Sequence, residues 1–228
     1  MARGPFATRY PAEVVRSLFT AALVLGFACG PTRPGSEDAG ALDAGPDGGP
    51  DASRYDPILG NPFDGPLELA DPRVEALDPS SLGGSAAPCR AAILARVTRI
   101  IDGDTIFVNG ESEAFSDRIR LIGVDTPELN ASPTPPDCYA LEAETFTQQL
   151  QSRLVWLTFD RTCLDPFDRH LAYVWIGGGP QDMWQRQLLR RGFGRELIIS
   201  PNDAYEAELD LDQYAAMLRS EGLWGACP

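Results

Sequence analysis

Apolar and polar residues alternate along residues 91–108, the stretch AAILARVTRIIDGDTIFV. A period of two is typical of strands with one face in a core, and the central Asp102-Gly103 pair is a turn signal. The stretch therefore predicts a pair of strands. Residues 117–125, DRIRLIGVD, predict another strand, which ends before Pro127 because proline has no N–H to donate to a ladder.

In the second half of the chain, apolar residues also recur at the spacing of a helix. In residues 139–154, Leu141, Phe146 and Leu150 recur on one side of a predicted helix. The remaining predicted elements are strands at 155–160 and 170–178, a short helix in residues 182–194 that ends at Gly192, and a longer helix that Pro201 opens and that closes near Gly222. Five strands with helices between and after them predict a mainly β fold, a five-stranded OB-type barrel capped by about three helices.

The first 28 residues are typical of an export signal. Arg3, Arg9 and Arg16 precede an apolar run, LFTAALVLGFA, that ends directly before Cys29. The run is too short to span a membrane stably. This order predicts a lipoprotein signal with Cys29 as the acylated residue. Plain secretion, an uncleaved anchor and a misplaced start are the alternatives.

Residues 29–88 are rich in Gly, Pro, Ala and Asp, which predicts a disordered acidic tether between the signal and a domain over 89–228. Within the tether, Leu67 and Leu69 are the residues expected to pack on the domain. The whole chain has a net charge of −14 and no lysine. Such a chain does not attract nucleic acid at long range, so a polyanionic substrate requires a strong local site.

Three motifs combine charged residues with predicted strands: IDGDT (101–105), RLIGVDTPE (120–128) and DPFDRHLAYV (165–174). In this order, with a helix between the last two, they resemble the staphylococcal nuclease (thermonuclease) family over about residues 93–226. The resemblance implies a five-stranded OB barrel with three helices, in agreement with the pattern above. It also implies hydrolysis of nucleic-acid phosphodiesters with Ca²⁺.

The resemblance assigns roles to six residues. Asp104 and Asp125 would bind Ca²⁺ through their carboxylates and Thr126 through its backbone carbonyl, because Ca²⁺ prefers oxygen ligands. Glu128 would orient or deprotonate the attacking water. Arg120 and Arg169 would bind the phosphate oxygens, which a planar guanidinium matches. The alternative is that Asp102 and Asp104 only shape a turn and that Arg120 pairs with a neighbouring acid.

The sequence departs from the family at Phe167-Asp168, where Tyr-Gly is usual. It also offers no aromatic ring in residues 196–199, where the family frames the nucleotide. The resulting expectation is a monomeric, exported, membrane-anchored or secreted nuclease of the cell envelope. It would cleave DNA, and RNA as a second substrate, with little sequence preference and leave 3′-phosphates. The alternatives are a weak or inactive barrel that acts as a binding module, and a structural envelope lipoprotein.

If Cys29 is acylated, four cysteines remain, and an even number in an exported domain predicts disulfides. Cys89 and Cys227 bracket the domain, whose termini are expected to lie close together. We therefore expect the pairs Cys89–Cys227 and Cys138–Cys163. The two other pairings and free thiols are the alternatives.

Overall fold

The computed structural model describes residues 63, 65–112, 114–130 and 133–228. The predicted export signal, Cys29 and most of the predicted tether lie outside these residues. Within them, no helix is both long and apolar enough to cross a membrane.

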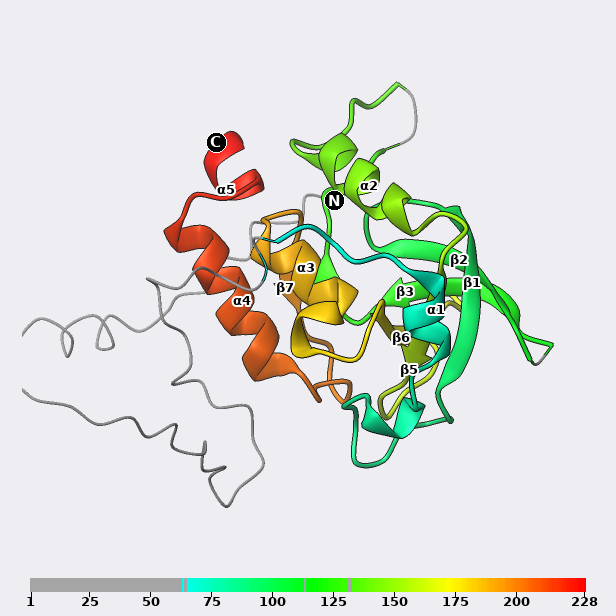
Figure 1. The fold of residues 1–228 in the computed structure, drawn as a ribbon. Coiled ribbons are helices and arrows are strands. Elements are labelled where there is room, and N and C mark those ends of the chain that lie inside the picture. Colours follow the sequence, from blue (N-terminus) through cyan, green and yellow to red (C-terminus); the bar gives the residue numbers. More distant parts are fainter. Residues whose placement is uncertain (1–62, 64, 113, 131–132) are drawn as a thin grey trace, which may run out of the picture. The chain divides into compact units, whose positions relative to one another are not determined.

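The centre of the fold is a closed five-stranded barrel, as predicted (Figure 1). Around the barrel the strand order is β1-β2-β3-β6-β5, and the β3–β6 pairing is parallel while the other pairings are antiparallel. The strands are β1 (Ile93–Ile100), β2 (Thr105–Gly110), β3 (Ser116–Leu121), β5 (Leu154–Thr158) and β6 (His170–Trp175).

The alternation seen in the sequence places one face of β1 in the barrel. Ile93, Ala95 and Val97 are buried, whereas the residues between them are only partly covered. The register with β2 shifts between Val97 and Arg99, which marks an irregularity of the β-bulge kind. The hairpin then turns through Asp102-Gly103 and returns as β2, as the pattern predicts.

The single strand predicted over residues 117–125 is divided in two. Gly123 has a φ of +80°, a left-handed conformation that side chains disfavour, and a Cβ there would lie 2.3 Å from Leu209 Cδ1. The chain bends here, and β4 (Gly123–Asp125) leaves the barrel to pair with β7 (Arg195–Leu197). This two-stranded ribbon carries Asp125 away from the barrel wall.

The helices pack beside the barrel. Helix α3 contacts β6, and α4 packs along α3 (Figure 1). The three expected helices are present as α2 (Ala140–Thr147), α3 (Trp184–Arg190) and α4 (Glu206–Leu218). The described residues also form the short helices α1 (Asp71–Glu75) and α5 (Leu223–Ala226), and 3₁₀ turns over Pro79–Ser81, Gln148–Leu150 and Pro180–Asp182.

Two helix predictions were wrong in detail. Pro201 does not open the last helix: it follows a cis Ser200-Pro201 bond in a turn, and α4 begins at Glu206. Leu141 is 56% exposed and not part of the buried stripe. The buried side of the helix is formed by the small residues Ala140 and Ala143 together with Phe146.

Packing against the core begins before residue 89, the residue at which the domain was expected to start. Val74 and Leu82 are buried, and Leu67 and Leu69 pack against the core, as expected of those two leucines. Trp156 Nε1 donates to the Val74 carbonyl at 2.9 Å. Several prolines and glycines do not prevent packing here, because the short helix α1 supplies its own backbone bonds and contacts β5.

The disulfide pairs differ from the prediction: Cys89 is bonded to Cys163, and Cys138 to Cys227. Strand register explains the first pair. In the antiparallel β1–β5 ladder Ile93 lies opposite Leu157, so the chain before β1 runs along the chain after β5. The Cys89 N–H donates to the Asp160 carbonyl at 2.7 Å, and the Cys89 and Cys163 Cα atoms are 5.7 Å apart. The register therefore places Cys89 beside Cys163 and not beside Cys227.

Candidate active site

Asp104 ties the β1–β2 hairpin to the end of β4. Its carboxylate is buried; Oδ2 accepts hydrogen bonds from the Thr126 backbone N–H (2.8 Å) and hydroxyl (3.2 Å), and Oδ1 accepts one from the Thr105 hydroxyl (3.0 Å). The approach is close: a Cβ on Gly103 would lie 2.7–2.9 Å from the Thr126 side chain. Glycine is required here so that Asp104 and Thr126 can meet.

Arg120 joins the two predicted metal-binding aspartates. From β3 its Nε lies 3.2 Å from Asp104 Oδ1, and its Nη2 lies 2.7 Å from Asp125 Oδ1. Its Nη1 donates to the carbonyls of Leu121 (2.8 Å) and Val124 (2.5 Å). Arg120 does pair with neighbouring acids, as the alternative interpretation held, but these are the two acids of the predicted site. These four partners fix the plane of the guanidinium and leave one of its five N–H groups, on Nη2, for another acceptor.

Glu128 lies in the electric field of both aspartates. Partial burial raises its pKa above the ordinary range, and the charges of Asp104 and Asp125 raise it further, whereas Arg120 opposes them. Burial likewise raises the pKa of Asp125; Asp104 adds to that increase, and both Arg120 and Arg169 oppose it. Five of the predicted residues are therefore electrostatically coupled around one place, and Thr126 is joined to them through Asp104.

Asp102 has the turn-forming role expected of it. Its Oδ1 accepts the Asp104 backbone N–H at 3.1 Å, two residues on, which is the geometry of an Asx turn. Burial, followed by the Asp104 charge, raises the pKa of Asp102 to about 6. Negative charge is thus concentrated at this hairpin.

Arg169 is aimed by Asp165, four residues before it. Asp165 Oδ2 accepts from Arg169 Nε at 2.6 Å, and Oδ1 accepts from the backbone N–H groups of Arg169 and Phe167. Asp168 between them has a φ of +58°. That conformation accounts for the glycine usual in the family, and aspartate is among the side chains that tolerate it. Phe167 is 71% exposed, and its ring lies 5.6 Å from the Arg169 guanidinium.

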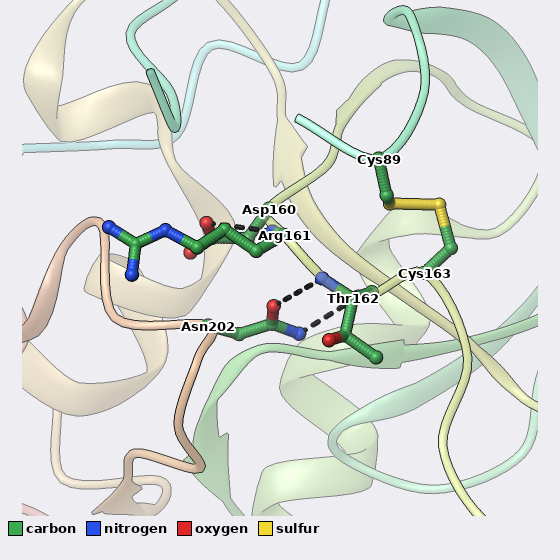
Figure 2. Close-up of a disulfide and its surroundings, with 6 residues drawn as sticks. All are labelled: Cys89, Asp160, Arg161, Thr162, Cys163 and Asn202. Atoms are coloured by element: carbon green, nitrogen blue, oxygen red, sulfur yellow. Dashed lines mark hydrogen bonds between the residues drawn. A yellow bond between two sulfur atoms is a disulfide. The ribbon is translucent and has the colours of Figure 1, made fainter. Parts of the chain in front are cut away.

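The segment before Arg169 is fastened at two places (Figure 2). The Cys89–Cys163 disulfide holds one side. On the other, the buried Asn202 side chain accepts from the Thr162 N–H at 2.8 Å and donates to the Thr162 carbonyl at 2.9 Å. Asp160, which is fully buried, accepts from Tyr173 and from the Ala204 N–H and anchors the start of the segment. These contacts restrict the movement of the loop that carries Arg169.

A cavity of about 370 Å³ opens beside the acids. Its polar lining consists of Asp125, Thr126, Glu128, Asp137 and Arg195. The Cys138–Cys227 disulfide, Leu223 and Pro228 complete the wall. A molecule in this cavity would lie directly against Glu128 and Asp125.

The donor atoms of the predicted metal set suit a hard cation. Asp104, Asp125 and the Thr126 carbonyl supply only oxygen, the ligand type of Ca²⁺. Asp104 raises the pKa of three neighbouring carboxyls, an excess of negative charge that a bound cation would relieve. Across the described ranges, no group of three or more His, Cys, Asp or Glu side chains is placed to hold a metal. The predicted set has two such side chains, Asp104 and Asp125, and its third predicted ligand is the Thr126 backbone carbonyl.

Three positioning residues were missed from the sequence. Asp165 precedes Arg169 by four residues within a quoted motif, and this spacing was a usable signal for an ion pair. Asp137 accepts from Asn130 Nδ2 at 2.8 Å and lies 3.4 Å from the Glu128 backbone N, and so supports the Glu128 loop. Nothing in the sequence indicated that Asn202 would bond to Thr162, forty residues away.

Comparison with known proteins agrees with this geometry. The family model described as "Staphylococcal nuclease homologue" matches residues 118–226. The thermonuclease of Staphylococcus intermedius is 37% identical over 129 residues, which are 56% of this chain and 74% of that protein. The thermonuclease of Staphylococcus hyicus is 35% identical over 130 residues, 57% of this chain and 74% of that protein. The chain belongs to the staphylococcal nuclease family.

Proposed function

We propose that this chain is an exported, calcium-dependent nuclease. It hydrolyses DNA, and RNA as a second substrate, with little sequence preference and leaves 3′-phosphate ends. The observation that carries the proposal is the arrangement of Arg120 between Asp104 and Asp125, with Glu128 in their field. The relatives named thermonuclease support the same activity.

Hydrolysis of a phosphodiester requires an activated water, a positioned phosphate and compensation of the charge that develops at phosphorus. Asp104, Asp125 and the Thr126 carbonyl are proposed to hold Ca²⁺, which supplies positive charge beside the phosphate when bound. Arg120 and Arg169 present planar guanidinium groups to the phosphate oxygens. Both are held before substrate arrives, Arg120 by two carbonyls and Arg169 by Asp165, so little reorganisation is needed.

Glu128 is proposed to take the proton of the attacking water. Its raised pKa makes the carboxylate a stronger base than an ordinary glutamate. It is exposed at the cavity, where water has access. The water oxygen then forms a bond to phosphorus while the bond from phosphorus to the 5′-oxygen breaks; the departing 5′-oxygen takes a proton from solvent, and Glu128 releases its proton to solvent.

Digestion of labelled DNA and RNA tests the proposal. Wild type is expected to cleave both with Ca²⁺ and neither with a chelator, and end analysis is expected to find 3′-phosphates. Glu128→Gln keeps the size of the side chain and serves as the matched inactive control. If the wild type binds the labelled strands with Ca²⁺ but does not cut them, the chain is a binding module and the proposed activity is wrong.

We further propose that Cys29 is acylated and that the preceding signal is removed, so that a monomer is tethered to the cell envelope through the segment after Cys29. A secreted protein is the alternative location. Cys29→Ser is expected to move the protein from the membrane fraction to the soluble fraction while digestion activity is retained. Continued sedimentation with membranes would contradict acylation at Cys29 and indicate an uncleaved anchor.

A further inference from the structure

Arg195 faces the cavity beside the proposed catalytic acids, and neither the motifs nor the proposed chemistry use it. It is the first residue of β7 and lies opposite Asp125 in the antiparallel β4–β7 ribbon. Residues directly opposite in such a pair point to the same face. The Arg195 and Asp125 side chains therefore share one face, and both line the cavity of about 370 Å³.

The guanidinium of Arg195 is held by an aromatic ring. It lies 4.5 Å from the centroid of the Trp224 ring, within the range of a cation–π contact. Trp224 belongs to α5, whose end is tied to the start of α2 by the Cys138–Cys227 disulfide. The ring thus has a covalently anchored support, and it fixes the direction of the arginine.

Arg195 forms no ion pair with any residue in the part of the chain that the structure describes. Its neighbour Asp125 turns its carboxylate to Arg120 instead. The chain has a net charge of −14, and Arg195 lies beside several acids. Because its guanidinium has no ion-pair partner among the described residues, it is available to bind an anion.

We infer that Arg195 binds a phosphate of the nucleic-acid strand that flanks the scissile phosphate. This inference rests on the proposed nuclease function. Asp125 links the two arginines, because it forms an ion pair with Arg120 and lies opposite Arg195 in the ribbon. A strand whose scissile phosphate lies at Arg120 can therefore place a neighbouring phosphate at Arg195. The cavity also contains Glu128 and Asp137, which repel an anion, and Arg195 offsets them locally.

Two substrates separate this role from chemistry at the scissile bond. A thymidine dinucleotide has one phosphodiester and cannot occupy both positions, whereas a longer single-stranded thymidine oligonucleotide can. Arg195→Gln is expected to raise KM for the oligonucleotide about tenfold, the size of one charge-assisted contact, with a much smaller effect on the dinucleotide. The slope of log affinity against log salt is expected to fall by about 0.7, the value for one phosphate contact on a single strand.

Arg99→Gln is the matched control. Arg99 is also exposed and also lies over an aromatic ring, 5.7 Å from the Phe107 centroid, but it does not line the cavity. The Arg99→Gln variant removes the same charge as Arg195→Gln. It is expected to leave the ratio of kcat/KM for the oligonucleotide to kcat/KM for the dinucleotide unchanged. Arg195→Lys retains the charge without the planar group and is expected to recover part of the loss.

The outcomes are distinct. If wild type cleaves neither substrate, the proposed function fails. If wild type cleaves both and Arg195→Gln loses the same factor on each, Arg195 acts at the reaction centre, and the flanking-phosphate role is wrong. An unchanged oligonucleotide KM in Arg195→Gln would also overturn it. Equilibrium binding of the oligonucleotide in chelator, measured by fluorescence anisotropy, gives a readout that is independent of turnover and is expected to weaken in the same variant.

Discussion

Two groups of acids in this domain differ in what surrounds them. The site cluster, Asp104, Asp125 and Glu128, lies around Arg120, which contacts both aspartates. The α4 cluster consists of Glu196 on β7 with Glu206 and Asp210 on α4; these line a surface hollow of about 590 Å³. Among the described residues, no arginine forms an ion pair with any member of the α4 cluster.

The difference appears in how the acids affect one another. Burial, with the charges of Asp210 and Glu206, raises the pKa of Glu196 to about 7, and nothing opposes the shift. At the site cluster, burial and the Asp104 charge raise the pKa values of Asp125 and Glu128, whereas the Arg120 charge lowers them. The acids of the α4 cluster therefore mainly repel one another, whereas the guanidinium of Arg120 and the Thr126 N–H hold the acids of the site cluster in place. This difference in surroundings is the reason why we propose chemistry for the site cluster and none for the α4 cluster.

The largest expected effect is on catalysis. Arg120→Ala and Glu128→Gln should each lower kcat/KM on single-stranded DNA about 10²-fold or more, because the first removes charge stabilisation and the second removes the base. Glu206→Gln is the control, since it removes a charge of the same sign from the α4 cluster. Steady-state kinetics measures all three variants. If Glu206→Gln lost as much activity as Glu128→Gln, the proposed difference in function between the two clusters would be wrong.

The second effect concerns the fastening of Arg169. A Cys89→Ser/Cys163→Ser variant should lose about 2–4 kcal/mol of unfolding free energy, because the disulfide closes a long loop of the unfolded chain. The Cys138→Ser/Cys227→Ser variant opens a loop of similar length, with sequence separations of 74 and 89, and should lose a similar amount. Urea denaturation measures both losses.

Only the first of these variants loosens the segment that carries Arg169. It should therefore show the greater fall in turnover of the single-phosphodiester dinucleotide, measured below the unfolding temperature. Equal turnover in the two variants would show that Asn202 and Asp165 position Arg169 without help from the disulfide.

The smallest effect is the pH dependence of the α4 cluster. The folded-state pKa of Glu196 is raised to about 7, above its unfolded value of about 4.5. Its protonated form therefore favours the fold at low pH, and this contribution is lost as the pH rises through 7. Glu196→Gln should raise the unfolding temperature at pH 8 and have little effect at pH 4. Because the side chain is partly exposed, the gain should stay below about 1 kcal/mol. Identical unfolding temperatures at pH 8 would show that the cluster is already screened.

The sequence predicted the barrel well, because period-two alternation and the Asp102-Gly103 turn define strands locally. The motifs led to a set of predicted site residues, of which the structure brings Asp104, Arg120, Asp125 and Thr126 into contact. The sequence could not predict which cysteines meet, since Cys89 reaches Cys163 only through the register of β1 with β5.

Other misses share a physical cause. Residues 65–88 have a loop-like composition, yet Val74 fills a place on β5 that only the folded barrel creates. The spacing of Leu141 is compatible with the buried side of a helix. The helix instead packs on the core through Ala140 and Ala143, whose small side chains allow a close approach, and Leu141 is exposed to solvent. Asp168 adopts a left-handed backbone conformation, which a glycine at this position would have indicated but an aspartate does not. In each case tertiary contacts decide between options that the local pattern leaves open.

Calorimetric titration with Ca²⁺ tests the difference between the two clusters most directly. Asp104→Asn keeps the size of the side chain and an acceptor for Thr126, but removes one ligand charge, so it should weaken Ca²⁺ binding at least about tenfold. Glu206→Gln removes one charge from the α4 cluster and should leave the affinity of the wild type unchanged. Unaltered affinity in Asp104→Asn, or an equal loss in Glu206→Gln, would contradict the assignment of the metal site to Asp104 and Asp125.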